Sequence, residues 1–207
     1  MPSETYRMEQ KCEEISHDIQ ENMKKYTSNY QEISQIVIDN FCSVEPPEIE
    51  SNAAKTRGIS FKHDTLGKVT SAKSVKPGNI SLNWKKLLLS GAESTFHTMA
   101  CISNPILIPL AAIIIWNKIW TNLQIDLDQR HATVLWTMWH NCDNNKKIDK
   151  IDLLSLVNEE CQKFNIPILH EKELSDICHD LERIKCIEDV DQSKRWFLIE
   201  KANIPYL

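Results

Sequence analysis

Residues 105–116 read Pro-Ile-Leu-Ile-Pro-Leu-Ala-Ala-Ile-Ile-Ile-Trp, within a run from position 94 to 117 that holds no Asp, Glu, Lys or Arg. A surface helix would present one polar face, and the segment from Ile106 to Ile115 presents none. This segment must therefore be buried in the protein itself, in a partner or in lipid. The choice among these environments decides how the rest of the chain is interpreted.

Several features of this segment favour lipid. Asn104 suits a helix N-cap and Pro105 the first helical position, and a helix from there to Thr121 would be about 26 Å long, slightly short of the roughly 30 Å hydrocarbon core. Trp116 and Trp120 lie four residues apart, as at a lipid–water boundary. The short apolar core is equally typical of a buried helix, so burial in a soluble oligomer is the alternative. The predicted membrane segment comprises Ile106, Leu107, Ile108, Leu110, Ile113, Ile114, Ile115, Trp116 and Trp120.

The residues before this segment are basic. Positions 51–90 hold eight Lys or Arg side chains and one Asp, and anionic lipid attracts each such cation by about 1 kcal/mol. We interpret 46–80 as a basic linker, and 81–122 as an apolar helical hairpin whose first helix runs from Leu82 to Ser103. A solvated linker that leans on the acidic N-terminal segment is the alternative. The predicted lipid-facing cations are Lys73, Lys76, Lys85 and Lys86.

An amphipathic helix is predicted for residues 1–45. Met8, Ile19, Tyr30 and Phe41 recur every eleven residues, which gives 3.67 residues per turn and keeps an apolar stripe on one face. Pro46-Pro47 would end the helix, because proline lacks the N–H and clashes with the preceding turn. The stripe fits either packing within its own domain or a coiled coil, and the second option predicts a homo-oligomer.

The segment 123–207 has the clearest domain pattern. A helix begins near Asp128, followed by a polar turn and a short extended piece at Ile148. Two further helices follow, with apolar side chains at helical spacing, and the segment ends in a predicted β-hairpin. The apolar positions of the two later helices are Leu153, Leu154, Val157, Cys161 and Phe164, then Leu174, Ile177, Cys178, Leu181 and Ile184.

This order of elements, with the stretch ELSDICHDLERIKCIED (173–189) followed by RWFLIE (195–200), resembles the winged helix-turn-helix superfamily. The resemblance covers about 80 residues and implies a fold more than a function. In a DNA-binding member the third helix would enter the major groove and need cations for phosphate contacts. Here five acidic side chains face three basic ones, which favours a protein partner over DNA. The possible nucleic-acid contacts are Lys172, Arg183, Lys185, Lys194 and Arg195.

No catalytic or cofactor site is expected. The four glycines cannot build a phosphate-binding loop, and no nucleophile stands beside a base and an orienting group. The turn from Asn141 to Asp152 resembles a calcium loop but lacks its glycine, and the cysteines show no Cys-x-x-Cys pair. Seven scattered cysteines and the absence of an N-terminal signal pattern predict a chain on the cytoplasmic side of a membrane, or in the cytoplasm.

Together these patterns predict a mainly α-helical protein with four parts: a long N-terminal amphipathic helix (1–45), a basic linker (46–80), an apolar helical hairpin (81–122) and a winged-helix-like domain with a small β-hairpin (123–207). The predicted function is a non-enzymatic, membrane-associated adaptor or effector whose last domain binds a protein partner. The alternative is a soluble, oligomeric winged-helix DNA-binding transcriptional regulator.

Overall fold

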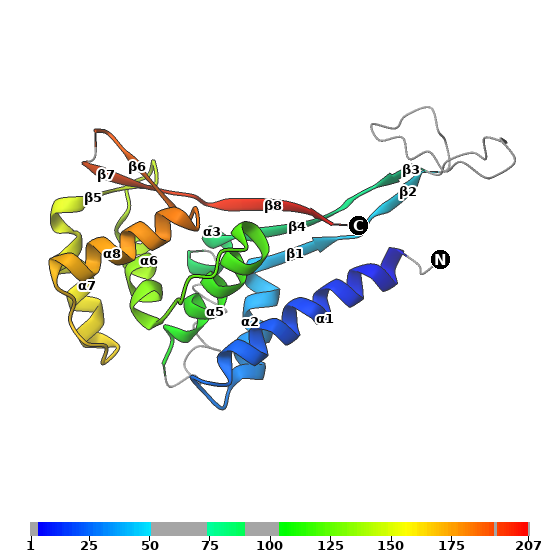
Figure 1. The fold of residues 1–207 in the computed structure, drawn as a ribbon, viewed down its shortest axis with the longest axis horizontal. Helices are drawn as coiled ribbons and strands as arrows, with labels where there is room; N and C mark the ends of the chain where they lie inside the picture. The colour runs from blue at the N-terminus through cyan, green and yellow to red at the C-terminus, as the bar shows by residue number, and fades with distance from the viewer. Residues whose placement is uncertain (1–3, 51–73, 90–103, 193, 207) are drawn as a thin grey trace, which may run out of the picture.

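The computed structural model describes residues 4–50, 74–89, 104–192 and 194–206, and they form a mainly α-helical fold with small antiparallel sheets (Figure 1). The described helices are α1 (Glu4–Met23), α2 (Tyr30–Phe41), α3 (Trp84–Leu88), α5 (Leu107–Trp116), the π-helix η2 (Asn117–Thr121), α6 (Gln129–Asn141), α7 (Lys150–Lys163) and α8 (Glu171–Arg183). The described strands are β1 (Cys42–Glu45), β2 (Glu48–Glu50), β3 (Ser74–Lys76), β4 (Gly78–Asn83), β5 (Lys147–Asp149), β6 (Ile187–Val190), β7 (Arg195–Leu198) and β8 (Lys201–Tyr206).

The apolar helix α5 lies at the centre of the molecule. It packs against α1 and α2 on one side and α6 on the other (Figure 1). Nine of its ten residues are buried, and only Ile114 is partly exposed. Because protein covers α5 on every side, the helix needs no polar face. Other parts of the same chain therefore surround this helix.

The predicted membrane segment is therefore wrong. None of the helices in the described part of the chain combines the length and the apolar character that crossing a bilayer requires. Of the residues assigned to lipid, Ile106 and the α5 residues belong to the core, and Trp120 lies exposed in η2. The prediction of membrane association through this segment fails with it. The cause is a confusion of two environments that both accept apolar surface, namely hydrocarbon and a protein interior.

The N-terminal stripe does not continue along one helix. The chain turns between Met23 and Tyr30, and α1 and α2 pack against each other as an antiparallel pair. Thr27-Ser28-Asn29 offers three residues that favour helix starts, and the Thr27 hydroxyl accepts a hydrogen bond from the Asn29 N–H at 3.1 Å. Both halves of the stripe face the core, with Ile15, Ile19 and Met23 from α1 and Ile33, Val37 and Phe41 from α2. The partner of the predicted coiled-coil stripe thus lies within the same chain.

Strands occupy most of the described residues of the predicted linker, 46–50 and 74–80. β1 pairs antiparallel with β4 alongside α1, and β2 pairs with β3 farther out, where the two strands extend beyond the helices (Figure 1). The helix ends at Phe41, earlier than predicted, and β1 follows it, so Pro46-Pro47 separate β1 from β2 and do not end the helix. The predicted helix from Leu82 begins instead at Trp84, after β4. Its part within 90–103, the linker residues 51–73 and the predicted lipid contact Lys73 lie outside the described residues.

The C-terminal elements α6 to β7 form a helical unit with a three-stranded sheet of order β5-β7-β6. Ile148 pairs with Trp196 and Ile187 with Leu198, so the buried side chains of all three strands lie against the helices. β7 is followed directly by β8, which pairs with β4 and completes the sheet β1-β4-β8. The N-terminal and C-terminal parts therefore share one sheet, and the predicted boundary after residue 122 does not separate their packing.

Two substitutions in α5 test this arrangement. Ile113 is fully buried, whereas the neighbouring Ile114 is partly exposed. We expect Ile113→Ala to lower the free energy of unfolding by about 2–5 kcal/mol, since it leaves a cavity in the core, and Ile114→Ala to cost clearly less. The helix propensities change equally in the two variants, so urea denaturation of both isolates the effect of burial. Equal losses would contradict the enclosed position of α5.

Candidate functional site

The cations predicted to contact nucleic acid do not form a free basic surface. Arg195 donates from Nε to Asp149 at 2.7 Å and lies 3.7 Å from Asp143. Arg183 donates to Asp180 at 3.2 Å, in the last turn of α8. The Lys185 ammonium lies over the ring of Trp120, 5.8 Å from its centre. Lys172 and Lys194 are exposed, the first at the start of α8 and the second in the β6–β7 turn.

The lysines around the small C-terminal sheet are also paired. Lys150 lies 2.8 Å from Asp189 and 3.8 Å from the centre of the Trp196 ring. Lys147 contacts Asp191 at 3.0 Å, and Lys146 pairs with Glu200. Each of these cations is matched by a carboxylate of the same unit, so the local charge is largely neutralised before any ligand arrives.

The predicted lipid-facing lysines lie in two different elements. Lys76 is exposed in β3, and Lys85 and Lys86 are exposed in α3. The Lys86 ammonium donates a hydrogen bond to the Asp39 carbonyl, at the end of α2, at 2.7 Å. This contact holds α3 against α2, which gives Lys86 a role in packing.

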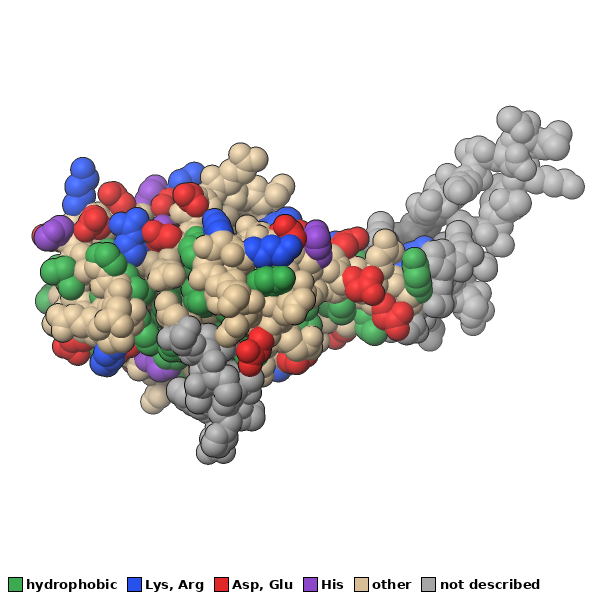
Figure 2. Space-filling view, turned by 90° about the horizontal axis from the view of Figure 1, so that it is seen from below, with side chains coloured by type: hydrophobic (Ala, Val, Ile, Leu, Met, Phe, Trp, Pro, Cys, Tyr) green, Lys and Arg blue, Asp and Glu red, His purple; other side chains and the backbone are tan. Residues whose placement is uncertain are grey.

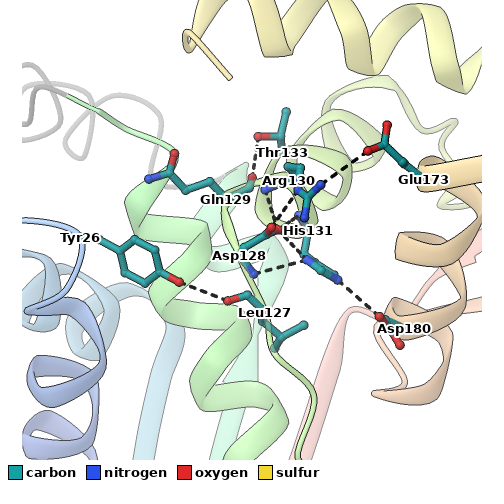
Figure 3. A network of polar contacts seen from close by, with 9 residues as sticks. All are labelled: Tyr26, Leu127, Asp128, Gln129, Arg130, His131, Thr133, Glu173 and Asp180. Atoms are coloured by element: carbon teal, nitrogen blue, oxygen red, sulfur yellow. Dashed lines mark hydrogen bonds and ion pairs between the residues drawn. The ribbon is translucent and has the colours of Figure 1, made fainter. Parts of the chain in front are cut away.

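A polar network joins the start of α6 to α8 (Figure 3). Asp128 caps α6, since its carboxylate accepts hydrogen bonds from the backbone N–H groups of Arg130 and His131 at 3.0 and 3.2 Å. The same carboxylate accepts from the Arg130 side chain at 2.8 Å. Arg130 in turn lies 3.7 Å from Glu173 in the first turn of α8. One capping residue thus organises the contact between two helices.

His131 is the buried centre of this network. Its Nδ1 lies 2.7 Å from Asp128 Oδ1 and 3.3 Å from the Asp128 backbone nitrogen, so the tautomer sets whether Nδ1 donates to the carboxylate or accepts from the backbone N–H. Its Nε2 lies 3.6 Å from Asp180 Oδ2 and makes no hydrogen bond in the described structure. The imidazole therefore stands between two carboxylates of different helices (Figure 3). It lies between α6 and α8, and Asp180 also accepts a hydrogen bond from the Arg183 guanidinium.

The thiols of this region are poor nucleophiles. Burial raises the pKa of Cys178 to about 12, and burial of Cys186 raises its pKa well above the ordinary value. Cys42, in the N-terminal half, behaves in the same way, with a pKa raised to about 12 by burial. The reactive form of cysteine is the thiolate, so these side chains act as small apolar core residues. Among the described residues, no group of three or more metal-ligating side chains comes together.

Two large apolar side chains stand out on the C-terminal unit. Ile151, in the first turn of α7, is 92% exposed, and Ile168, in the loop before α8, is 55% exposed. Figure 2 shows apolar side chains among charged ones at the end of the molecule formed by α7 and α8. The helices α7 and α8 together carry eight acidic and four basic side chains, a net charge of −4. The surface of this unit thus combines exposed isoleucines with an excess of carboxylates.

Comparison of the chain with protein-family models, with curated proteins and with solved structures gave no match. The site is therefore assigned from its own chemistry. Sequence reasoning located the start of α6 at Asp128 but missed His131, because the second carboxylate that faces it comes from a distant helix. Ile151 could have been found, since it lies two residues before the buried Leu153 and therefore points away from that side chain.

The charge on Asp128 should stabilise the fold. Burial by itself would raise the pKa of Asp128, but hydrogen bonds from His131 and Arg130 outweigh it and hold that pKa well below its ordinary value. The stabilisation is therefore fully present above the unfolded pKa of about 3.9 and is lost as the pH falls through the lower folded pKa. Asp128→Asn keeps the cap and removes the charge. We expect it to lower the free energy of unfolding at neutral pH by about 1 kcal/mol, after allowance for partial exposure.

The matched control is Asp126→Asn. Asp126 is exposed two residues earlier and caps no helix, so its substitution should leave stability unchanged. Urea denaturation at neutral pH and again in acid should show the Asp128 difference shrinking as the pH falls. A difference that persists unchanged in acid would show that the carboxylate charge is not the cause.

Proposed function

We propose that this chain is a non-enzymatic adaptor whose C-terminal unit is a winged-helix-like module that binds a protein partner. The order α6, β5, α7, α8, β6, β7 and the sheet order β5-β7-β6 support the resemblance to the winged helix-turn-helix superfamily. In that arrangement α8 is the helix that nucleic-acid-binding members place in the major groove. The side chains on α8 therefore decide which kind of partner the module fits.

The charge of α8 is the observation that carries the proposal. Its outward residues include Glu171, Asp176 and Glu182, and its one arginine is already bound to Asp180. A phosphate backbone would meet carboxylates there and gain little from counterion release. The β6–β7 turn adds Lys194 alone as an exposed cation without a carboxylate partner in the described structure. A protein surface with basic groups fits these carboxylates better than DNA does.

The exposed isoleucines supply the apolar part of such an interface. Burying one fully exposed isoleucine is worth about 1.5–3 kcal/mol, and Ile151 at 92% exposure offers nearly all of that on contact. Exposed carboxylates nearby, such as Asp152, favour a partner whose rim is basic. The expected partner therefore presents an apolar centre flanked by lysine or arginine.

Quantitative affinity enrichment from cells tests this function. The comparison is between the wild-type chain and the double variant Ile151→Glu, Ile168→Glu, both checked for unchanged helical content. We expect at least one protein to be enriched by the wild type and reduced about tenfold with the variant, since two added charges oppose burial. Leu89→Glu is the matched control, because Leu89, directly after α3, is 41% exposed and its substitution should leave the enrichment intact.

A DNA titration tests the alternative function, that of a DNA-binding transcriptional regulator. Fluorescence anisotropy with a mixed-sequence duplex at about 50 mM salt should show no saturable binding at micromolar protein, because phosphate contacts need free cations. Saturable binding that weakens steeply with salt, and that Lys172→Ala with Lys194→Ala removes, would overturn the proposal in favour of DNA recognition.

A further inference from the structure

Trp120 is the only exposed tryptophan among the six in the chain, all of which lie in the described residues. The other five are buried or half-buried, whereas Trp120 is 37% exposed. Leu123, three residues later, is exposed to the same extent. A large aromatic side chain on the surface is costly to hydrate and is enriched at protein interfaces. Its surroundings therefore indicate what covers it.

The π-helix η2 (Asn117–Thr121) carries Trp120 on a backbone held by several hydrogen bonds. The Asn122 N–H donates to the Asn117 carbonyl at 2.7 Å, and Asn122 has a positive φ of 52°. The Asn117 amide donates to the Leu123 carbonyl at 2.8 Å, and the Thr121 hydroxyl donates to the Asn117 side chain at 2.7 Å. A turn bonded in this way has little backbone entropy left to lose on binding. π-helical turns are frequent at functional sites.

A hollow of about 420 Å³ lies directly beside this turn, between α1 and the sheet strands β4 and β8. The most deeply buried of its lining side chains are the apolar Ile15 and Ile80. The hollow is open to solvent on one side, which suits an inserted protein side chain better than a small ligand that must be enclosed. Its lining residues include Ile15, Ile80, Ile119, Ile204 and Tyr206.

The rim of the hollow carries both signs of charge. Lys118 lies 2.6 Å from Asp18, and Lys11 lies 2.7 Å from Glu14. All four side chains are between 31% and 52% exposed, so they can exchange partners. A rim with two cations and two anions attracts no charged small molecule strongly. It is, however, complementary to a copy of itself turned by a two-fold rotation.

We propose that the chain forms a two-fold symmetric homodimer in which Trp120 of each copy enters the hollow of the other. A projecting side chain and a hollow that share one turn form a self-complementary surface, as an isologous interface requires. Lys118 of one copy then meets Asp18 of the other, since both side chains line the hollow and are partly exposed. This interface uses η2, α1 and β8 and leaves the exposed isoleucines of the C-terminal unit free.

Sedimentation velocity of the full chain over a wide concentration range tests the dimer. We expect the wild type to shift reversibly from the 24.0 kDa monomer to a species of twice that mass. Trp120→Ala should raise the dimer dissociation constant at least about tenfold, because the central aromatic residue of an interface carries much of its binding energy. Leu89→Ala, at an exposed apolar position that belongs to neither proposed surface, is the matched control and should leave the constant unchanged.

Lysine cross-linking of mixed light and heavy-isotope chains locates the interface. Links between copies should join lysines around the hollow and η2, such as Lys11, Lys118 and Lys185. A wild type that stays monomeric overturns the proposal, as does a dimer that Trp120→Ala leaves intact or one cross-linked only through other faces. A monomer that carries a small molecule in native mass spectrometry would assign the hollow to a ligand and also overturn it.

Discussion

The whole structure depends on enclosing one helix whose circumference is entirely apolar. Each side of α5 left in water would expose several isoleucine or leucine side chains, and each would cost about 1.5–3 kcal/mol. Three helices from two distant parts of the chain provide the cover, α1 and α2 before α5 and α6 after it. The turn between Met23 and Tyr30 serves the same end, because it folds one predicted long helix into two that can both lie against α5.

The enclosure also ties the two halves of the molecule together. The indole N–H of Trp116, at the end of α5, donates to the Ile184 carbonyl at 2.8 Å, where α8 ends. Phe41, Trp84 and Trp116 form an aromatic cluster with ring centres 4.6–6.3 Å apart, which joins α2, α3 and α5. The C-terminal unit is thus fixed to the central helix and does not hang from a free linker. Any partner that binds α7 and α8 acts on a surface continuous with the core.

The sequence predicted those elements that local periodicity determines. The apolar positions of α7 and α8 follow the predicted helical spacing, the start of α6 at Asp128 was expected, and the mainly helical class is confirmed. Hydropathy failed at α5, because it measures how much apolar surface a segment has and not what covers it. The eleven-residue repeat did not show that the segment is one helix, since a turn of suitable length lets the apolar stripes of both shorter helices face the core. The His131 site could not be predicted, because Asp180 reaches it only through the packing of α8 on α6.

The pairing of β4 with β8 also determines how this protein can reach its native state. Ser81 and Asn203 bond across this ladder although 122 residues separate them. Contacts of such separation require the ends of a long loop to meet. The conformational entropy of the loop is therefore lost before the strand pairing can compensate for it. Until β8 pairs, the edge of β4 that faces it therefore stays unpaired while the intervening helices fold. During that interval the edge is open to strands of other molecules, and a fast-forming helical core around α5 shortens the exposure.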